Sequence, residues 1–387
     1  MWWCRASGAR RGQDCKASWR TAQRPCPGRT SYNLGVELGR DGLSIYVRLP
    51  NWVGDVLLAT PFLRALRAAA PRARIVAHGK RAALELLGRE GLFAQAVALP
   101  RGSGLLGPWR EGRRVRREAG RPDLALLLPN SFSSALTAWA TGAVERVGYG
   151  LNERGPLFTR ALPVVRQGRL RPIPMVDYYL ALLQSLSPTP LAPQPRRPQL
   201  AIDDQDRARA AARLAELGVP AGARPWAINL GGAWETKRWI PAHAGALVRL
   251  LRAEGVVPLL LWGPGEEGLR DEVVAAAGGE VPGAGGMLGL AELAPALSLC
   301  ELMVSTDSGP RHFGVAAGIP VLVLIGSTHP GYTTVDYPGL ELLCEQVECW
   351  PCHLKRCPID FRCMQRLGPD KVLAAARALL ARAGSPA

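Results

Sequence analysis

The stretch VSTDSGPRHFGVAAGIPVLVLIGSTHP, residues 304–330, decides how the fold is interpreted, because it has the pattern of strand, turn, helix and strand. After the first apolar run, Asp307-Ser308-Gly309 has residue types that favour a turn and the start of a helix. Gly318 to Pro320 ends that helix before a second apolar run at 321–325. Polar residues therefore follow a buried strand, where open α/β sheets bind ligands and a helix offers free N–H groups to an anion.

Strand-like and helical patterns alternate along the rest of the chain. Strand-like runs occur at 43–49, 74–77, 96–99 and 124–128, with helical periodicity at 56–70, 81–87 and 131–140. Beyond residue 200, strand-like runs at 226–230 and 256–262 alternate with helical patterns at 242–253, 266–277 and 290–299. This alternation predicts an α/β protein with two Rossmann-like, doubly wound domains of parallel strands, which face each other across a central cleft.

The segment 188–198 is rich in proline and has no hydrophobic periodicity, so we interpret it as a semi-rigid linker. It separates a first domain at 41–187 from a second domain at 199–387. Residues 1–40 contain early basic residues but no apolar core of a secretory signal, and we expect a disordered N-terminal extension.

Composition limits the classes of protein that fit. With 387 residues and 48% hydrophobic content, the chain can form two full cores and is too apolar for overall disorder. Its apolar runs fall short of the ~18 residues that a membrane-spanning helix needs. The net charge of +16 is compatible with nucleic acid, an anionic membrane surface or acidic substrates. Only five of the 48 basic residues are lysine, and such an arginine bias often reflects genome composition, so the charge is weak evidence for a partner.

Three short segments carry candidate chemistry. Asp55 follows the first strand, where its carboxylate could act as a general base, although a first-turn Asp is common without any such role. Paired Gly231 and Gly232 allow close backbone approach, and Lys237 and Arg238 can neutralise a diphosphate without a metal; the alternative is a glycine turn with solvated charges. Glu266 could accept hydrogen bonds from a ribose, or could merely begin a helix, and Glu267 competes for the assignment.

Two further features have alternative interpretations. The four cysteines of segment 349–363 could bind a structural zinc, form disulfides or stay reduced, and we expect no catalytic role for them: Cys349, Cys352, Cys357 and Cys363. The run REGRRVRR at 110–117 could present a basic helix face to an anionic acceptor or membrane, or could be a solvated helix.

Five motifs in order resemble the ADP-heptose:lipopolysaccharide heptosyltransferases of glycosyltransferase family 9, and are most similar to its heptosyltransferase II branch. They are NWVGD with RALR at 51–67, GGAWETKRW at 231–239, TDSGPRH at 306–312, GSTHP at 326–330 and CWPC with the following cysteines at 349–364. The resemblance covers residues 43 to the C-terminus. It implies a GT-B fold and inverting, metal-independent transfer of heptose from ADP-heptose to the lipid A-linked inner core of lipopolysaccharide. No cofactor is implied. We expect a cytoplasmic protein that meets the anionic inner-membrane surface transiently.

The resemblance also implies roles for individual residues. Asp55 would be the catalytic base, Lys237 would stabilise the departing ADP, and Asp307 would bind the heptose hydroxyls. The remaining donor-binding residues would surround the ribose and phosphates: Gly231, Gly232, Arg238, Glu266, Ser308, Gly309 and His312. The sequence departs from the family pattern in two places, because Arg311 adds a charge beside the expected phosphate site and His329 stands where an Asp is frequent.

Two alternative functions remain at this point. The same fold could transfer a sugar from another nucleotide sugar, or the chain could be a non-enzymatic, basic nucleotide- or nucleic-acid-binding protein. Phe and Tyr are few and are not interleaved with the arginine runs, so we expect no nucleic-acid partner. Three histidines receive no role from the sequence: His78, His243 and His353.

Overall fold

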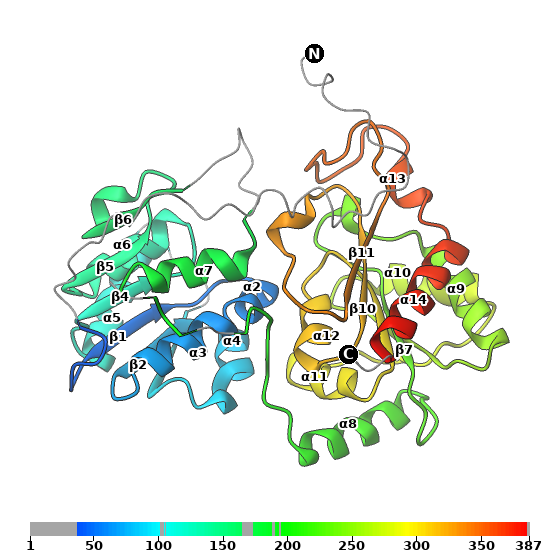
Figure 1. The fold of residues 1–387 in the computed structure, drawn as a ribbon, viewed down its shortest axis with the longest axis horizontal. Helices are drawn as coiled ribbons and strands as arrows, with labels where there is room; N and C mark the ends of the chain where they lie inside the picture. The colour runs from blue at the N-terminus through cyan, green and yellow to red at the C-terminus, as the bar shows by residue number, and fades with distance from the viewer. Residues whose placement is uncertain are drawn as a thin grey trace.

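The structure is a computed structural model that describes residues 37–100, 104, 106–164, 173–187, 190–192 and 195–384. It contains two parallel β-sheets, each flanked by helices, which lie side by side in Figure 1. The predicted α/β class with two doubly wound halves is confirmed. Most of the expected N-terminal extension and parts of the expected linker fall outside the described residues.

The first sheet has the strand order β3-β2-β1-β4-β5-β6 with parallel neighbours throughout. Its strands are β1 (Ser44–Arg48), β2 (Arg74–Gly79), β3 (Gln95–Ala98), β4 (Leu124–Leu127), β5 (Glu145–Tyr149) and β6 (Arg160–Leu162). The central strands β1 and β4 are almost entirely buried, because helices cover both faces of the sheet. Both faces of these strands are therefore apolar, and their sequences are continuous apolar runs rather than alternating patterns.

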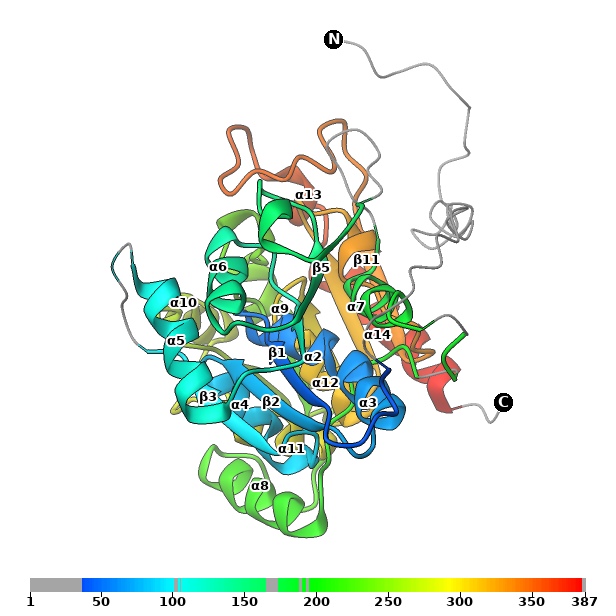
Figure 2. The ribbon, with the colours of Figure 1, turned by 90° about the vertical axis from the view of Figure 1, so that its left-hand side faces the viewer.

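Helices cover the first sheet on both sides: α2 (Val53–Leu58), α3 (Thr60–Ala69), α4 (Arg81–Leu87), α5 (Gly107–Ala119), α6 (Phe132–Ala140) and α7 (Met175–Gln184). A short 3-10 helix, Gly88–Glu90, follows α4. In Figure 2, α5 and α6 lie on one side of β1, and α3 and α7 lie on the other. Val115 of α5 and Tyr46 of β1 belong to one core cluster, whereas Phe62 of α3 and Val47 belong to another.

A buried polar network fixes α5 on this sheet. The Tyr46 hydroxyl lies 2.7 Å from His78 Nδ1, and His78 Nε2 lies 2.9 Å from Glu111 Oε1. Burial alone would raise the pKa of Glu111, but hydrogen bonds from His78 and Arg114 outweigh it and lower that pKa to about 2. Glu111 therefore points inward from the basic run 110–117, and four of its arginines are exposed: Arg110, Arg113, Arg116 and Arg117.

The second sheet has the strand order β11-β10-β9-β7-β8, again with parallel neighbours. Its strands are β7 (Trp226–Asn229), β8 (Pro258–Leu261), β9 (Leu302–Thr306), β10 (Val321–Ile325) and β11 (Leu340–Cys344). The helices around it are α8 (Asp204–Glu216), α9 (Pro241–Ala253), α10 (Glu267–Ala277), α11 (Leu290–Ser298), α12 (Arg311–Ala317), α13 (Arg362–Gln365) and α14 (Pro369–Gly384).

The stretch 304–330 folds as β9, turn, α12 and β10, as its sequence predicted. Strands β9 and β10 pair in parallel and are fully buried. Gly314 allows α12 to pack closely on them, since a Cβ at this position would lie 2.8 Å from a Val321 methyl group. The turn 307–310 is therefore held at the carboxyl edge of the sheet.

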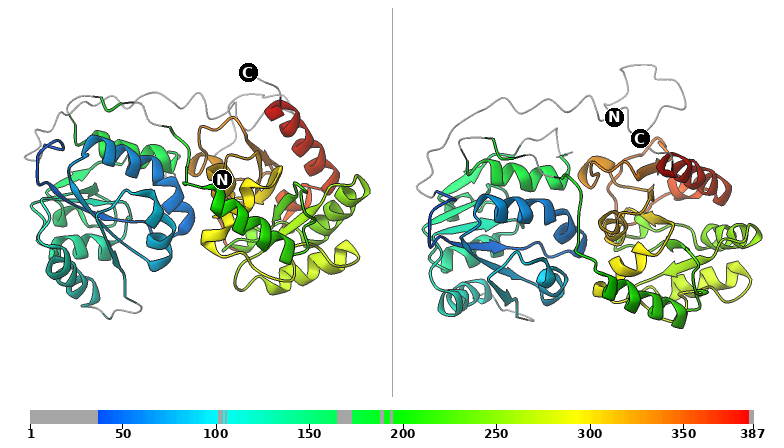
Figure 3. Two further views of the ribbon diagram at one scale, coloured as in Figure 1. Left: turned by 90° about the horizontal axis from the view of Figure 1, so that it is seen from below. Right: turned by 60° about the horizontal axis from the view of Figure 1, so that its bottom comes forward.

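The two halves meet where α2 contacts α12, and Figure 3 shows them side by side from two directions. The contact is close at Gly54, where an added Cβ would lie 3.1 Å from Gly309 Cα and 3.2 Å from His312 Cδ2. Both α2 and α12 follow the carboxyl end of a central strand. The carboxyl edges of the two sheets therefore face each other, which is the arrangement expected for a cleft between two Rossmann-like domains.

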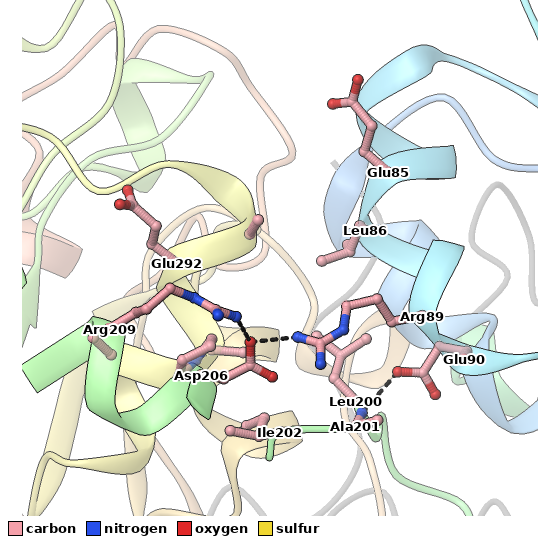
Figure 4. Close-up of a pocket in the computed structure, with 14 residues that line it drawn as sticks. Glu85, Leu86, Arg89, Glu90, Leu200, Ala201, Ile202, Asp206, Arg209 and Glu292 are labelled. Carbon is pink, nitrogen blue, oxygen red and sulfur yellow. Dashed lines mark hydrogen bonds and ion pairs between the residues drawn. The ribbon is translucent and has the colours of Figure 1, made fainter. Parts of the chain in front are cut away.

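A second contact between the halves lies around a cavity of about 310 Å³ (Figure 4). Arg89, which follows α4, forms ion pairs with Asp203 and Asp206 at the start of α8. Glu90 accepts a hydrogen bond from the backbone N–H of Ala201, at 2.7 Å. Arg89, Glu90 and Asp206, which line this cavity, thus help to join the halves. No helix among the described residues is long and apolar enough to cross a membrane.

Candidate active site

The predicted donor segments come together at the carboxyl edge of the second sheet. Strands β7 and β9 are neighbours, with Asn229 opposite Ser305. The Asn229 side-chain amide donates hydrogen bonds to Ser305 Oγ at 3.1 Å and to Ser308 Oγ at 2.9 Å. The Thr306 hydroxyl donates to the carbonyl of Gly231. The glycine pair at 231–232 and the turn at 307–310 therefore form one surface.

Asp307 is buried at the centre of this surface and has four side-chain partners. Oδ1 accepts a hydrogen bond from the Thr333 hydroxyl at 2.9 Å and lies 3.3 Å from Arg311 Nε. Oδ2 accepts from the Thr328 hydroxyl at 2.6 Å and lies 3.4 Å from Lys237 Nζ. Burial by itself would raise the pKa of Asp307, but Arg311 and Lys237 hold it below the usual range. Asp307 thus accepts hydrogen bonds from two hydroxyls and from Lys237, and its remaining partner, Arg311, pairs with it through charge.

Arg311 points into the second half of the molecule. Its side chain is buried, pairs with Asp307 and donates to the carbonyl of Thr333. Its guanidinium is therefore engaged inside the fold, and the expectation that it adds a charge beside the phosphate site stays a prediction.

Lys237 ends a short 3-10 helix, Glu235–Lys237, and its side chain is 21% exposed. Nζ donates to the carbonyl of Asp307 at 3.1 Å and lies 5.3 Å from the centre of the Trp234 ring. The 3.4 Å separation from Asp307 Oδ2 exceeds the roughly 2.7–2.9 Å of a strong charged hydrogen bond. Lys237 is thus held loosely enough to engage an incoming anion.

Glu266 precedes α10 and accepts hydrogen bonds from two backbone N–H groups. Gly232 donates to Oε1 at 2.9 Å, and Gly263 donates to Oε2 at 3.0 Å. The Glu266 carboxylate can take this position because residue 231 is glycine, since a Cβ there would lie 2.1 Å from Glu266 Oε1. Glu266, rather than Glu267, therefore lies against the glycine pair. Arg238 contacts the same loop by donating from Nε to the carbonyl of Gly232 at 3.0 Å.

Asp55 comes from the other half of the molecule. It lies in the first turn of α2, as the non-catalytic interpretation of its position also predicted. Burial raises its pKa to about 6, and the positive charge of Lys237 opposes that rise. Asp55 therefore lies beside the contact between α2 and α12, close enough to Lys237 for the lysine charge to influence its pKa.

The residues around the start of α12 differ in what they can offer an anion. Helix α12 has seven residues, so its dipole is small, and Gly309 is close to Gly54 of the other half. His312 is buried, and burial and Arg311 lower its pKa well below the usual value. A neutral His312 cannot supply positive charge, which leaves Lys237 and Arg238 as the cations on this surface.

The cysteines of segment 349–363 are free thiols, with Cys349 exposed and the other three half-buried: Cys352, Cys357 and Cys363. Burial raises the pKa of Cys363 to about 11. Across the described ranges, no group of three or more His, Cys, Asp or Glu side chains is arranged to hold a metal ion. The four thiols are unpaired in this structure, and the zinc and reduced-thiol interpretations both stay predictions.

The comparison of the sequence with known families decides the class of this site. Residues 110–361 match the family described as "Glycosyltransferase family 9 (heptosyltransferase)", which is more than half of the chain. The chain belongs to glycosyltransferase family 9. The predicted family and enzyme class, a glycosyltransferase, are confirmed.

Relatives and solved structures agree with this assignment. Lipopolysaccharide heptosyltransferase 2 of Escherichia coli (strain K12) is 30% identical over 310 residues, which cover 75% of this chain and 85% of that protein. Lipooligosaccharide heptosyltransferase 2 of Haemophilus influenzae is 26% identical over 302 residues, with the same shares covered.

Two solved structures share the fold. A glycosyl transferase family 9 protein from Veillonella parvula DSM 2008 has a TM-score of 0.74 and 21% identity, covering 89% of this chain and 99% of that one. The E. coli ADP-heptose lps heptosyltransferase II has a TM-score of 0.71 and 23% identity, covering 89% and 100%. The GT-B architecture expected from the motifs is confirmed.

Sequence reasoning missed several residues that the fold brings to this surface. Thr328 and Thr333 bind Asp307 from the loop after β10. Thr328 belongs to the GSTHP motif, but a threonine in a loop gave no sign of a buried carboxylate partner. The sequence also suggests no role for His353. Segment 349–363 folds back against the loop after β10, and the backbone N–H of His353 donates to the Ser327 carbonyl at 2.9 Å.

Proposed function

We propose that this glycosyltransferase transfers heptose from ADP-heptose to the inner core of lipopolysaccharide. The names of its relatives, lipopolysaccharide and lipooligosaccharide heptosyltransferase 2, support this substrate class. The observation that carries the proposal is the close contact of α2, which holds Asp55, with α12, which follows Asp307, the partner of Lys237. This contact supports a site in which a base and a cation act from opposite sides of one cleft, as transfer between two bound sugars requires.

The proposed reaction is a single displacement. Asp55 removes the proton of the acceptor hydroxyl while the oxygen of that hydroxyl attacks the anomeric carbon of the donor heptose. The bond from that carbon to the ADP oxygen breaks, and ADP leaves on the opposite side, which inverts the configuration. With a pKa of about 6, Asp55 is mostly ionised at neutral pH and can accept this proton.

Lys237 and Arg238 are proposed to stabilise the negative charge that develops on the departing diphosphate. Glu266 has one unused acceptor position on each oxygen and is the proposed ribose contact. We propose that Ser308, Gly309 and His312 line the phosphate path, with His312 neutral.

Because Lys237 and Arg238 can supply the positive charge, we propose that transfer needs no metal or other cofactor. Treatment with a chelator should leave the rate unchanged, and a loss restored by Mg²⁺ would contradict this part of the proposal.

The role of Asp307 is proposed to differ from the one that family resemblance implied. Both of its oxygens already accept hydrogen bonds from protein groups, and two cations flank them, so a heptose hydroxyl would compete with these partners. We propose that Asp307 positions Lys237, which leaves Oδ2 as the diphosphate arrives.

The acceptor and the membrane are proposed to approach the first half. At the start of α5, Leu106 and Trp109 are 59% and 42% exposed, beside the exposed arginines of the basic run. The Arg113 guanidinium lies 6.0 Å from the centre of the Trp109 ring. Aromatic and basic groups together suit an anionic lipid surface. We therefore propose transient contact with the cytoplasmic face of the inner membrane, where a lipid A-linked acceptor is anchored.

The direct test is a transfer assay with purified protein, ADP-heptose and lipopolysaccharide whose inner core is truncated. The product should gain the mass of one heptose, and reactions without acceptor or with ADP-glucose and UDP-glucose should give no product. Transfer from one of these other nucleotide sugars, but not from ADP-heptose, would overturn the assigned donor.

A further inference from the structure

Four ring side chains gather next to the Lys237–Asp307 pair. Trp350 stacks on His329, with ring centres 6.1 Å apart and planes 22° from parallel. His353 packs edge-on against Tyr332, with ring centres 5.8 Å apart, and Tyr332 lies 6.3 Å from His329. We call these residues the ring cluster. Two of them come from the loop after β10, and two come from segment 349–363.

The loop after β10 connects the ring cluster to the active site. Its Thr328 and Thr333 bind Asp307, while the carbonyl of Ser327 accepts a hydrogen bond from the backbone N–H of His353. Ser327 Oγ donates to Thr236 Oγ1 at 2.9 Å, and Thr236 in turn donates to the carbonyl of Leu354. Because Thr236 directly precedes Lys237, hydrogen bonds connect the ring cluster to the segments that hold both Lys237 and Asp307.

Two ring nitrogens of the cluster are buried without a partner. Trp350 Nε1 and His353 Nε2 form no hydrogen bond to any part of the chain that the structure describes. A buried donor or acceptor left unpaired costs about 1–3 kcal/mol, and most such groups in native proteins have a partner. Two such nitrogens in one ring cluster, at the edge of an active site, indicate that a bound molecule provides the partners.

The chemistry of the cluster selects the kind of group that it would bind. Burial and the nearby Lys237 lower the pKa of His353, so its ring is neutral and offers no charge to a phosphate. A neutral imidazole and an indole N–H pair well with hydroxyl groups, and flat apolar rings suit the face of a sugar. Asp307, the residue first expected to bind sugar hydroxyls, already accepts a protein hydroxyl on each of its oxygens.

We propose that Trp350 and His353 form a sugar-binding wall, in which Trp350 Nε1 and His353 Nε2 hydrogen-bond to hydroxyls of a sugar held beside Lys237 and Asp307. This inference rests on the proposed glycosyl transfer and adds two specificity residues to it. Either the donor heptose or the acceptor sugar can supply the hydroxyls, and the two sources are separated by the test.

The test uses two substitutions that remove one hydrogen-bonding group each. Trp350→Phe keeps an aromatic ring on His329 but lacks the N–H, and His353→Leu lacks the ring nitrogens, whereas His353→Gln restores a polar group of similar reach. Ile359→Ala is the matched control, because Ile359 is in the same segment and 59% exposed. For each variant, thermal unfolding, calorimetric binding of ADP and of ADP-heptose without acceptor, and kcat and KM for both substrates are measured.

If the wall binds the donor heptose, Trp350→Phe and His353→Leu weaken ADP-heptose binding by about 2- to 12-fold, the equivalent of one neutral hydrogen bond, and leave ADP binding unchanged. If it binds the acceptor, donor binding is unchanged and the acceptor KM rises by a similar factor. In both cases His353→Gln recovers part of the loss, and Ile359→Ala behaves as wild type.

Unchanged donor binding and acceptor KM in both variants would overturn the inference. An equal loss of ADP and ADP-heptose binding would also overturn it, because the segment would then support the fold rather than recognise a sugar. Wild-type protein that binds ADP-heptose no more tightly than ADP, and transfers no heptose, would contradict the proposed function itself.

Discussion

At the scale of single residues, Lys237 connects the two parts of the proposed mechanism. It interacts electrostatically with Asp55 and lies 3.4 Å from Asp307 Oδ2. Lys237→Ala should lower kcat by about 10²- to 10³-fold, because it removes the main positive charge from the departing diphosphate. Lys355→Ala, an exposed lysine of the neighbouring segment, should have no effect. A raised KM for ADP-heptose with unchanged kcat would limit Lys237 to ground-state binding.

The pKa of Asp55 predicts how transfer depends on pH. Because burial raises this pKa to about 6, the free enzyme loses its base when the pH falls below about 6. A plot of kcat/KM against pH should therefore rise through about pH 6 and level off near neutrality. A flat profile between about pH 5 and 8 would argue against Asp55 as the base.

Sequence identified candidate residues better than it identified their partners. Asp55, Lys237 and Glu266 follow strands of parallel sheets, so topology alone brings them to facing edges. The inward direction of Arg311 depends on how α12 packs against the loop after β10, which no local pattern encodes. For the same reason, the partners of Asp307 in the loop after β10, Thr328 and Thr333, could be identified only from the folded structure.

At the scale of elements, the contact of α2 with α12 is set by the absence of a side chain at Gly54. Gly54→Val would place a branched side chain against Gly309 Cα and the His312 ring, so α2 should be pushed away from α12 and Asp55 with it. Transfer should fall by more than about tenfold while ADP-heptose binding to the second half persists, since misplacement of about 1 Å can have large effects on rate. Gly88→Val is the control, because nothing lies within 4 Å of a Cβ at Gly88. Normal kcat in Gly54→Val would show that this contact is not needed for transfer.

The elements also show where sequence patterns are informative. The buried central strands were predicted from continuous apolar runs, as β1, β4, β9 and β10 illustrate. No prediction was made for β5, β6 or β11. Strand β6 has three residues, and β5 begins with two half-buried polar positions, so neither contains a long apolar run. Their positions are determined by pairing within the sheet, of β5 with β4 and of β6 with β5.

At the scale of the whole molecule, the halves are joined at the active-site contact and again at Arg89. The ion pair of Arg89 with Asp206 joins residues 117 positions apart, which explains why sequence reasoning did not find it. Arg89→Glu would face Asp203 and Asp206 with a like charge. Solution scattering should then show a larger radius of gyration, with the thermal unfolding of the protein little changed. Arg72→Glu is the control, since Arg72 pairs on the surface with Asp41 within the first half. An unchanged radius in Arg89→Glu would mean that this contact does not hold the halves together.

The central claim is that the base and the donor site come from different halves, and Asp55→Asn tests it most directly. ADP-heptose affinity and the rate of heptose transfer to truncated lipopolysaccharide are measured on the same preparation. The account predicts that donor affinity stays within about twofold of wild type while transfer falls by about 10²-fold or more. Transfer at the wild-type rate, or a loss of donor binding that matches the loss of transfer, would contradict a divided site in which Asp55 acts only on the acceptor.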